Sequence, residues 1–174
     1  MNLQESIIKA VRDIPDFPVK GVIFKDVTPL FADINLYNKI IDNIVDLYTN
    51  KNITKVAGLE SRGFIFGISV AQKLNVPFIL IRKKGKLPYK TVSTTYSLEY
   101  GSATIEMHID SVNEKDNVLI VDDLLATGGT ACAAADLIKQ LNGNVAAFAF
   151  VIELTFLNGK DKLKGIPYST IVTY

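Results

Sequence analysis

The stretch that most constrains the fold is VLIVDDLLATGGTACAAADLI, residues 118–138. It runs from an apolar segment into two adjacent acids, Asp122 and Asp123, and then through a Thr-Gly-Gly-Thr turn into an alanine-rich segment. A short apolar run that ends at a glycine turn before a helical pattern is typical of a strand followed by a helix. In open α/β sheets, ligands bind beyond the carboxyl ends of the strands. The stretch therefore predicts both an α/β unit and a candidate binding site at its centre.

The rest of the chain alternates between short apolar runs and helical patterns. The periodicity predicts helices at 3–12, 34–48, 63–74 and 129–141, and strands at 55–60, 77–83, 117–123 and 144–154. Strands that are apolar throughout and alternate with helices are typical of a parallel sheet covered on both faces. We therefore predict an α/β fold with a mainly parallel central sheet flanked by helices.

One segment has a different pattern. Residues 102–110 alternate apolar and polar side chains, which predicts a half-exposed strand with Glu106 and His108 on its polar side. We expect His108 to be a surface residue rather than a catalyst, and the strand to form a hairpin with part of the preceding stretch. That stretch has no helical period and is rich in Lys, Ser, Thr and Gly. Because so long a loop in a compact domain is usually functional, we predict a flexible flap at about residues 84–101.

The composition excludes several classes of protein. The 174 residues contain no linker, repeat or low-complexity tract, so a single domain is predicted over residues 1–174. The net charge of +1 gives no overall field that would attract nucleic acid or a membrane surface. The longest apolar run, residues 145–152, is far shorter than the roughly 20 residues of a membrane span. The only cysteine, Cys132, is expected to be a small buried thiol that forms no intrachain disulfide, which favours a cytoplasmic location.

The turn after the paired acids is suited to an anion. Gly128 and Gly129 permit backbone angles that let several amide N–H groups converge at the start of a helix, where the helix dipole also favours negative charge. The Thr127 and Thr130 hydroxyls can add hydrogen bonds. The acids cannot hold the same phosphate, but they can accept hydrogen bonds from vicinal hydroxyls or contact a metal ion through water. A sugar phosphate would satisfy the turn and the acids together.

Other interpretations of this stretch compete with a sugar-phosphate site. A glycine pair is common where a strand meets a helix, and an Asp near a helix start is often only a cap. A phospho-acceptor receiver domain also has paired acids at a strand end. It needs further acids after the first strand, however, where GLESRG supplies only Glu60. The nucleotide-binding patterns GxxxxGK[ST] and GxGxxG do not occur in the chain.

The string VLIVDDLLATGGT resembles the ribose-phosphate signature of the type I phosphoribosyltransferases, which use 5-phosphoribosyl 1-pyrophosphate. Further stretches resemble the members that act on adenine: FPVKGVIFKD (17–26), GLESRGFIFG (58–67), IRKKGKLP (81–88), YSLEYG (96–101) and IELT (152–155). The resemblance spans nearly the whole chain. It implies the type I phosphoribosyltransferase fold with a small hood and a flexible flap. It also implies a purine-salvage homodimer that makes AMP and pyrophosphate from adenine and the ribose donor, with Mg²⁺ held mainly by the substrate.

The resemblance also implies roles for individual residues. The catalytic residues would be Glu99, which handles the purine proton, together with Asp122 and Asp123. The ribose 5-phosphate group would be bound by the same two acids and by Ala126, Thr127, Gly128, Gly129 and Thr130. Pyrophosphate would be bound by Glu60, Ser61, Arg62, Lys83 and Lys86, with a non-prolyl cis peptide bond between Glu60 and Ser61. Adenine would contact the backbone around Ile23 and Lys25 and the side chains of Phe24 and Leu154.

Alternatives to these roles stay open. The family often has Val and Arg where this chain has Ile23 and Lys25, so a contact specific to Arg would be weakened. The five bases in residues 82–90 could form a solvated face or a weak nucleic-acid patch, and Phe24 and Leu154 could be core residues. The base could be hypoxanthine, guanine or xanthine instead of adenine. A non-catalytic sensor of the ribose donor would need a separate binding segment, for which we expect no room in 174 residues.

Overall fold

The computed structural model describes residues 1–97 and 101–174. The chain divides into two compact units, residues 1–43 and residues 44–174, each with its own buried residues. Glu99, the predicted handler of the purine proton, lies outside the described residues. In the described part of the chain, no helix combines the length and the apolar character needed to cross a membrane.

The first unit is a helix followed by a two-stranded hairpin and further helix. It contains α1 (Leu3–Ala10), β1 (Arg12–Pro15), β2 (Ile23–Asp26), α2 (Thr28–Ala32) and the beginning of α3 (Ile34–Tyr48). A capping box between Asn2 and Glu5 starts α1. The helix predicted for residues 3–12 ends at Ala10, because Arg12 already pairs with Asp26 in the antiparallel hairpin. The hairpin itself was not predicted.

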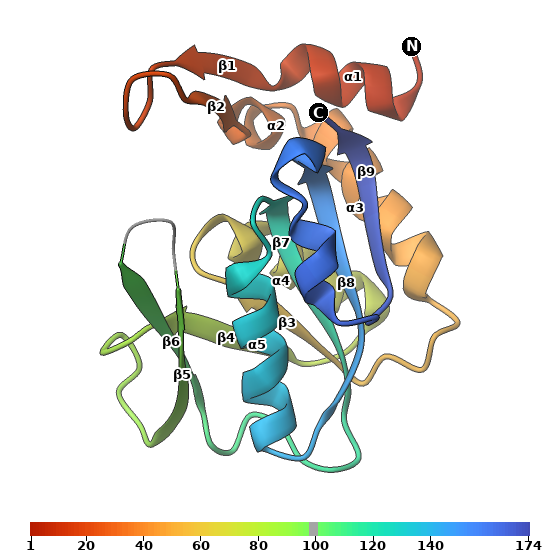
Figure 1. The fold of residues 1–174 in the computed structure, drawn as a ribbon. Coiled ribbons are helices and arrows are strands. Elements are labelled where there is room, and N and C mark those ends of the chain that lie inside the picture. The colour runs from red at the N-terminus through yellow and green to blue at the C-terminus, as the bar shows by residue number, and fades with distance from the viewer. Residues whose placement is uncertain (98–100) are drawn as a thin grey trace. The chain divides into compact units, whose positions relative to one another are not determined.

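The second unit is an α/β sandwich around a seven-stranded sheet (Figure 1). Its elements are β3 (Lys55–Leu59), α4 (Arg62–Leu74), β4 (Phe78–Lys83), β5 (Thr91–Ser97), β6 (Ser102–His108), β7 (Asn117–Leu125), α5 (Gly129–Gln140), β8 (Asn144–Glu153), η1 (Thr155–Leu157), η2 (Gly159–Leu163) and β9 (Tyr168–Thr173). The strand order is β5-β6-β4-β3-β7-β8-β9, in which β4, β3, β7, β8 and β9 pair in parallel. Strands β5 and β6 form an antiparallel hairpin on β4. The predicted mainly parallel sheet is confirmed.

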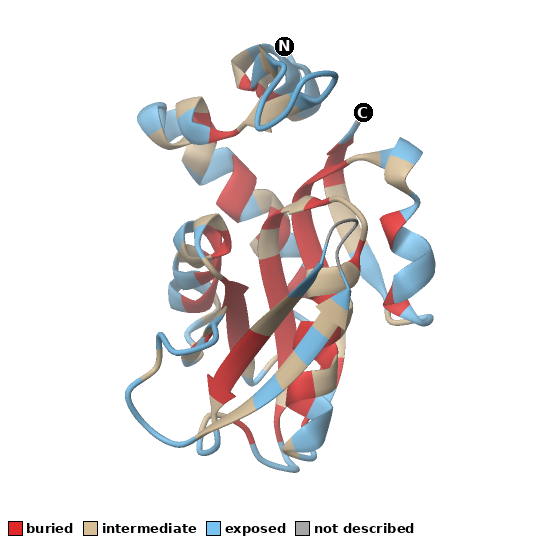
Figure 2. Cartoon of the chain, turned by 60° about the vertical axis from the view of Figure 1, so that its left-hand side comes forward, coloured by how far each residue is buried: buried red, intermediate tan, exposed pale blue. Residues whose placement is uncertain are grey.

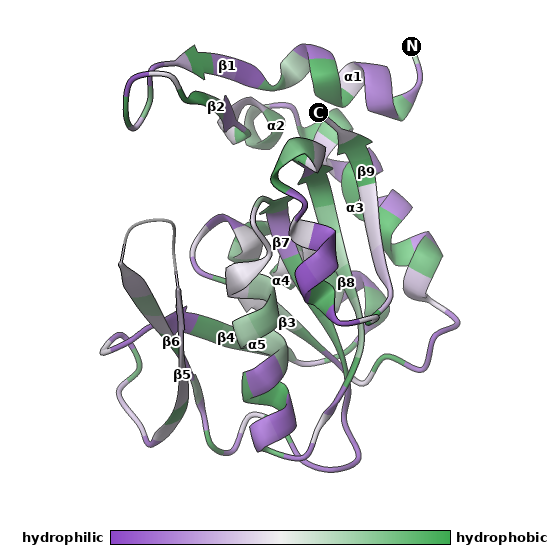
Figure 3. Cartoon of the chain, in the orientation of Figure 1, coloured by the Kyte–Doolittle hydropathy of each residue, from purple (hydrophilic) through white to green (hydrophobic). Residues whose placement is uncertain are grey.

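The core of the second unit lies on both faces of the sheet. Helix α5 covers the face toward the viewer of Figure 1, and α4 covers the other face. Figures 2 and 3 show the central strands as buried and largely hydrophobic. The alanines of α5 that face the sheet are buried, and small side chains let the helix approach it closely. The packed sheet therefore positions the loops at the carboxyl ends of β3, β4 and β7.

Three expectations about single residues are wrong in detail. Glu106 is only 4% exposed, although the alternation of β6 predicts a solvent-facing side chain. His108 is half-buried, because the ring of Tyr89 lies edge-on against it with the ring centroids 6.1 Å apart. Cys132 is half-buried rather than buried. The loop before β5 lies outside the local sequence window of β6 and covers Glu106 and His108. Cys132 lies on a flank of α5 that leaves it partly open.

Candidate active site

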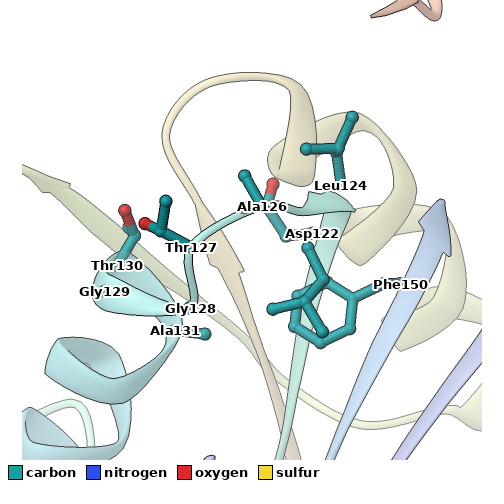
Figure 4. A pocket seen from close by; sticks show the side chains of 10 residues that line it. Asp122, Leu124, Ala126, Thr127, Gly128, Gly129, Thr130, Ala131 and Phe150 are labelled. Carbon is teal, nitrogen blue, oxygen red and sulfur yellow. The ribbon is translucent and has the colours of Figure 1, made fainter. Parts of the chain in front are cut away.

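Residues 126–130, here called the phosphate turn, join β7 to α5 and enclose a small cavity (Figure 4). Gly128 has a φ of +75°, a conformation that glycine adopts without strain. The backbone of Gly159 packs directly against it, so a side chain at position 128 would collide with the Gly159 carbonyl. The cavity has a volume of about 70 Å³, and the residues around it include Asp122, Thr127 and Thr130. This space fits one small group beside the amides that open α5.

A second cavity, of about 350 Å³, adjoins the phosphate turn. It is lined by Glu60, Ser61, Arg62, Lys83, Asp122, Asp123, Leu124 and Thr130. The two cavities share Asp122, Leu124 and Thr130. The structure therefore brings the predicted acids, the phosphate turn and most of the predicted pyrophosphate residues into one continuous region of the second unit.

The paired acids differ in their surroundings. They lie within β7 rather than after it, because the strand continues to Leu125. Arg62 Nε lies 2.8 Å from Asp123 Oδ2, an ion-pair distance, although this buried oxygen accepts no well-aligned hydrogen bond from the described residues. Asp122 Oδ1 accepts a hydrogen bond of 2.9 Å from the Asp123 amide. Burial raises the pKa of Asp122 well above its usual range, and the charge of Asp123 raises it further.

The start of α4 packs tightly against the acids. A Cβ atom on Gly63 would lie 2.7 Å from Asp122 Oδ1, so only glycine fits at this position. The neighbouring Glu60–Ser61 peptide bond is cis, as the resemblance implied. The sequence alone gave no signal that Gly63 of SRGF would contact a residue of β7, because the two are distant in the chain.

Glu60 organises the other wall of the larger cavity. Its Oε2 atom accepts hydrogen bonds from Arg82 Nε at 3.2 Å and from the Lys83 amide at 3.0 Å. Burial alone would raise the pKa of Glu60, but these hydrogen bonds and the nearby positive charges outweigh it and lower the pKa. Lys83 lines the cavity, whereas Lys86 is exposed and is not one of the lining residues. Glu60 therefore acts as an acceptor within the protein.

The sequence interpretation gave no role to Tyr96, although it quoted YSLEYG. The Tyr96 hydroxyl lies 2.9 Å from Thr130 Oγ1, so the carboxyl end of strand β5 is hydrogen-bonded to the start of α5. A Cβ atom on Gly129 would lie 3.1 Å from the Tyr96 ring. No periodicity in the sequence could have found this contact, since it joins two elements across the sheet edge.

The predicted adenine residues lie in different units. Ile23, Phe24 and Lys25 belong to β2 of the first unit, where Phe24 packs edge-on against Phe17 with ring centroids 5.2 Å apart. Lys25 Nζ lies 2.7 Å from Asp13 Oδ1. Leu154 follows β8 in the second unit and is half-buried. Phe24 and Leu154 are therefore both half-buried, and neither is a fully buried core residue.

The chemistry of this region is that of a site for a phosphorylated sugar. Converging amides, hydroxyl groups and paired carboxylates can hold a phosphate and vicinal hydroxyls. Arg62 and Lys83, here called the basic wall, line the larger cavity and can hold a second anion. The chain belongs to the phosphoribosyltransferase family, since the model of the phosphoribosyl transferase domain matches residues 28–166.

The similar proteins narrow this class. An adenine phosphoribosyltransferase from Nitrosococcus oceani is 51% identical over 170 residues, which cover 98% of this chain and 99% of the relative. The crystal structure of adenine phosphoribosyltransferase from Thermoanaerobacter pseudethanolicus has a TM-score of 0.96 and 44% identity, and covers 99% of this chain and 100% of that chain. The Trypanosoma brucei enzyme in complex with AMP, pyrophosphate and ribose-5-phosphate has a TM-score of 0.91 and 28% identity, with 99% of this chain and 80% of that chain covered. Within the family, the chain groups with the adenine phosphoribosyltransferases.

Proposed function

We propose that the chain transfers the 5-phosphoribosyl group of 5-phosphoribosyl 1-pyrophosphate to adenine and releases pyrophosphate, a purine-salvage reaction that forms AMP. One observation carries this proposal: the phosphate turn, the paired acids and a basic wall line two cavities that share Asp122 and Thr130. The donor has a matching order of groups, with a 5′-phosphate, vicinal ribose hydroxyls and a pyrophosphate. The similarity of this chain to adenine phosphoribosyltransferases, which extends along its whole length, supports adenine as the acceptor.

The phosphate turn would bind the 5′-phosphate. The amides at the start of α5 would donate to the phosphate oxygens, and the Thr127 and Thr130 hydroxyls would add hydrogen bonds. This assignment covers Ala126, Thr127, Gly128, Gly129 and Thr130. Asp122 and Asp123 would accept hydrogen bonds from the ribose hydroxyls and stabilise the positive charge that develops at the anomeric carbon. Arg62 is ion-paired with Asp123. When the donor binds, the positive charge of Arg62 would be shared between Asp123 and the pyrophosphate group.

The leaving group would be stabilised by the basic wall. When the bond between the anomeric carbon and the pyrophosphate oxygen breaks, its electron pair stays with pyrophosphate, whose negative charge increases. Cations at this place stabilise the transition state more than the ground state. Arg62, Lys83 and Lys86 would supply them, and Glu60 and Ser61 would shape the loop that holds Arg62. The new bond forms from a purine ring nitrogen, whose proton Glu99 would accept.

Mg²⁺ would be the metal of this reaction. In residues 1–97 and 101–174, no three His, Cys, Asp or Glu side chains converge in a way that could hold a metal ion. Asp122 and Asp123 nevertheless offer the hard carboxylate oxygens that Mg²⁺ prefers. Asp123 Oδ2, which accepts no well-aligned hydrogen bond from the described residues, could exchange its ion pair with Arg62 for a metal contact when the substrate binds. The two acids therefore fit a metal ion whose other ligands come from the substrate. When bound, Mg²⁺ would neutralise part of the pyrophosphate charge.

The Phe24 and Leu154 side chains would contact adenine, as the family resemblance implies, and the backbone around Ile23 and Lys25 would contact its edge. The exposed fraction of Ile23, 58%, is large for an apolar side chain and leaves this strand open to a ligand. We also propose a homodimer and a cytoplasmic location, in keeping with the family and with the single cysteine.

A direct product assay tests this function. The protein is incubated with Mg²⁺, 5-phosphoribosyl 1-pyrophosphate and one of adenine, hypoxanthine, guanine or xanthine, and nucleotide formation is followed by chromatography. We expect AMP from adenine and much less product from the other bases. A preference for a 6-oxopurine would overturn the adenine assignment, and the absence of any nucleotide would overturn the transfer reaction.

A further inference from the structure

Glu106 is a buried carboxylate in the middle of β6. Its side chain is 4% exposed, and both of its oxygens accept hydrogen bonds. Oε1 accepts from the amides of Lys86 at 3.0 Å and Leu87 at 3.1 Å, and Oε2 accepts from Thr91 Oγ1 at 3.3 Å. Lys86 and Leu87 belong to the stretch of chain that connects β4 to β5, and Thr91 is the first residue of β5. The carboxylate therefore fastens this connection to the sheet.

A buried carboxylate costs free energy unless hydrogen bonds replace its lost hydration. The alternating strand could hold an uncharged residue at this position without changing its pairing with β4 and β5, because strand pairing uses main-chain groups. The buried charge of Glu106 is therefore explained by the groups that donate hydrogen bonds to it. It holds the main chain of the segment IRKKGKLP, which contains the proposed pyrophosphate ligands Lys83 and Lys86.

Arg82, the cross-strand neighbour of Glu106, also contacts the main chain of Lys86. Arg82 lies directly opposite Glu106 in the pairing of β4 with β6. Arg82 Nη1 donates to the Lys86 carbonyl at 3.0 Å, while Glu106 accepts from the Lys86 amide. Both main-chain polar groups of Lys86 are thus fixed by one pair of side chains. Arg82 Nε also donates to Glu60, which accepts from the Lys83 amide and lines the larger cavity.

We propose that Glu106 is a positioning residue that sets the main chain at Lys86 and thereby directs the Lys83 and Lys86 ammonium groups toward pyrophosphate. A lysine ammonium on a flexible side chain gains binding energy only after the rotamer freedom of the side chain is lost. A fixed main chain lowers the total entropy cost of binding, because only the lysine side chains, and not the loop as well, must be ordered when the ligand binds. The proposal rests on the proposed function, since it takes pyrophosphate to be the anion bound by the basic wall.

The test separates the two anions of the site. Isothermal titration calorimetry is carried out with pyrophosphate and, separately, with ribose 5-phosphate, both in the presence of Mg²⁺. The variant Glu106→Gln keeps the shape of the side chain and removes its charge, and Glu114→Gln is the matched control because Glu114 is exposed. We expect Glu106→Gln to weaken pyrophosphate binding roughly 10-fold, as is typical for the loss of a hydrogen bond to a charged group. Ribose 5-phosphate should bind Glu106→Gln as it binds the wild type, and Glu114→Gln should bind both ligands normally.

A milder variant guards against misfolding of Glu106→Gln. Thr91→Val removes only the hydrogen bond to Oε2 and keeps the two from the Lys86 and Leu87 amides, so it should weaken pyrophosphate binding less than Glu106→Gln does, about threefold. Unchanged pyrophosphate affinity in the folded variants would overturn the positioning role. Equal losses for both ligands with a lowered Tm would overturn it too, because Glu106 would then be a general structural residue. If the wild type itself binds ribose 5-phosphate but no pyrophosphate, the assignment of the basic wall fails, and the positioning role fails with it.

Discussion

The phosphate turn and the basic loop, residues 83–90, are both proposed to bind anions, but they are built in different ways. The phosphate turn offers main-chain amides at the start of α5, and Gly128 is locked against Gly159. The basic loop offers exposed lysines, and its main chain is held by the side chains of Glu60, Arg82 and Glu106. One site is made by the local backbone, whereas the other depends on side chains from strands β4 and β6 and from the loop after β3.

This difference has a consequence for how each site responds to substitution. A main-chain site is damaged by changes that alter the backbone, and the identity of most side chains in it matters little. A site whose main chain is held by hydrogen bonds from other side chains is damaged by the loss of any one of these side chains, even one that never contacts the ligand. Substitutions that affect one region and spare the other can therefore test the comparison.

The largest effect is expected where the two regions meet. The double variant Asp122→Asn with Asp123→Asn should lower the turnover number at least about 100-fold, because charge stabilisation at the reacting sugar is lost. The fold should be kept, as both side chains retain their shape. The measurement is the steady-state rate of AMP formation, with circular dichroism as the check on folding. Asp110→Asn with Asp161→Asn is the control, since both of these acids are exposed. A rate equal to that of the wild type would contradict the role of the pair.

The next largest effect concerns the backbone of the phosphate turn. Gly128 and Gly165 have nearly the same φ, +75° and +76°, but only Gly128 has another backbone segment against the position of a Cβ atom. Alanine at either position should cost about 1–2 kcal/mol in backbone strain. Gly128→Ala should lose more, because Gly159 must move as well.

Thermal unfolding measures this difference. Gly165→Ala should lower Tm by a few degrees, given about 2–4 °C per kcal/mol for a chain of this size. Gly128→Ala should lower it clearly further and should also abolish ribose 5-phosphate binding in calorimetry. If the two variants have equal Tm values and equal affinities, the close approach of Gly159 does not constrain the phosphate turn.

A smaller effect follows from the raised pKa of Asp122. Because burial and Asp123 hold this pKa well above the ordinary value of 3.8, the folded state binds a proton that the unfolded state releases. Stability from this group is complete below the ordinary pKa and is lost as the pH rises through the raised one. Asp122→Asn cannot ionise, so its Tm relative to the wild type should be higher at pH 8 than at pH 5. The same difference at both pH values would show that Asp122 titrates normally.

The smallest effect is expected at the contact between β5 and the phosphate turn. Tyr96→Phe removes the hydrogen bond to Thr130 and keeps the ring that packs on α5. The KM for 5-phosphoribosyl 1-pyrophosphate should rise about two- to tenfold, the range for one neutral hydrogen bond, while kcat and the KM for adenine change little. Tyr89→Phe is the control because Tyr89 is 56% exposed. A change in the KM for adenine alone would mean that Tyr96 acts on the other substrate.

Much of the fold could be predicted because its elements are encoded in short windows of sequence. The helix predicted at 34–48 is α3, and the apolar run at 145–152 lies inside β8. The order of strands and helices from β3 to β8 also followed from periodicity, as did the hairpin of β5 and β6, whereas β9 was not predicted. The hairpin of β1 and β2 was missed because neither strand carries a strong alternating pattern.

The sequence by itself determined the phosphate turn and the paired acids, because glycines, hydroxyls and carboxylates that follow one strand must share one end of the sheet. It also indicated the family, through motifs spread along the chain. Only the tertiary structure decided that Arg62 pairs with Asp123, that Gly159 closes on Gly128 and that Glu106 is buried beneath the basic loop. The physical reason is distance along the chain: each of these contacts joins segments whose mutual approach is set by the packing of the sheet and by no local pattern.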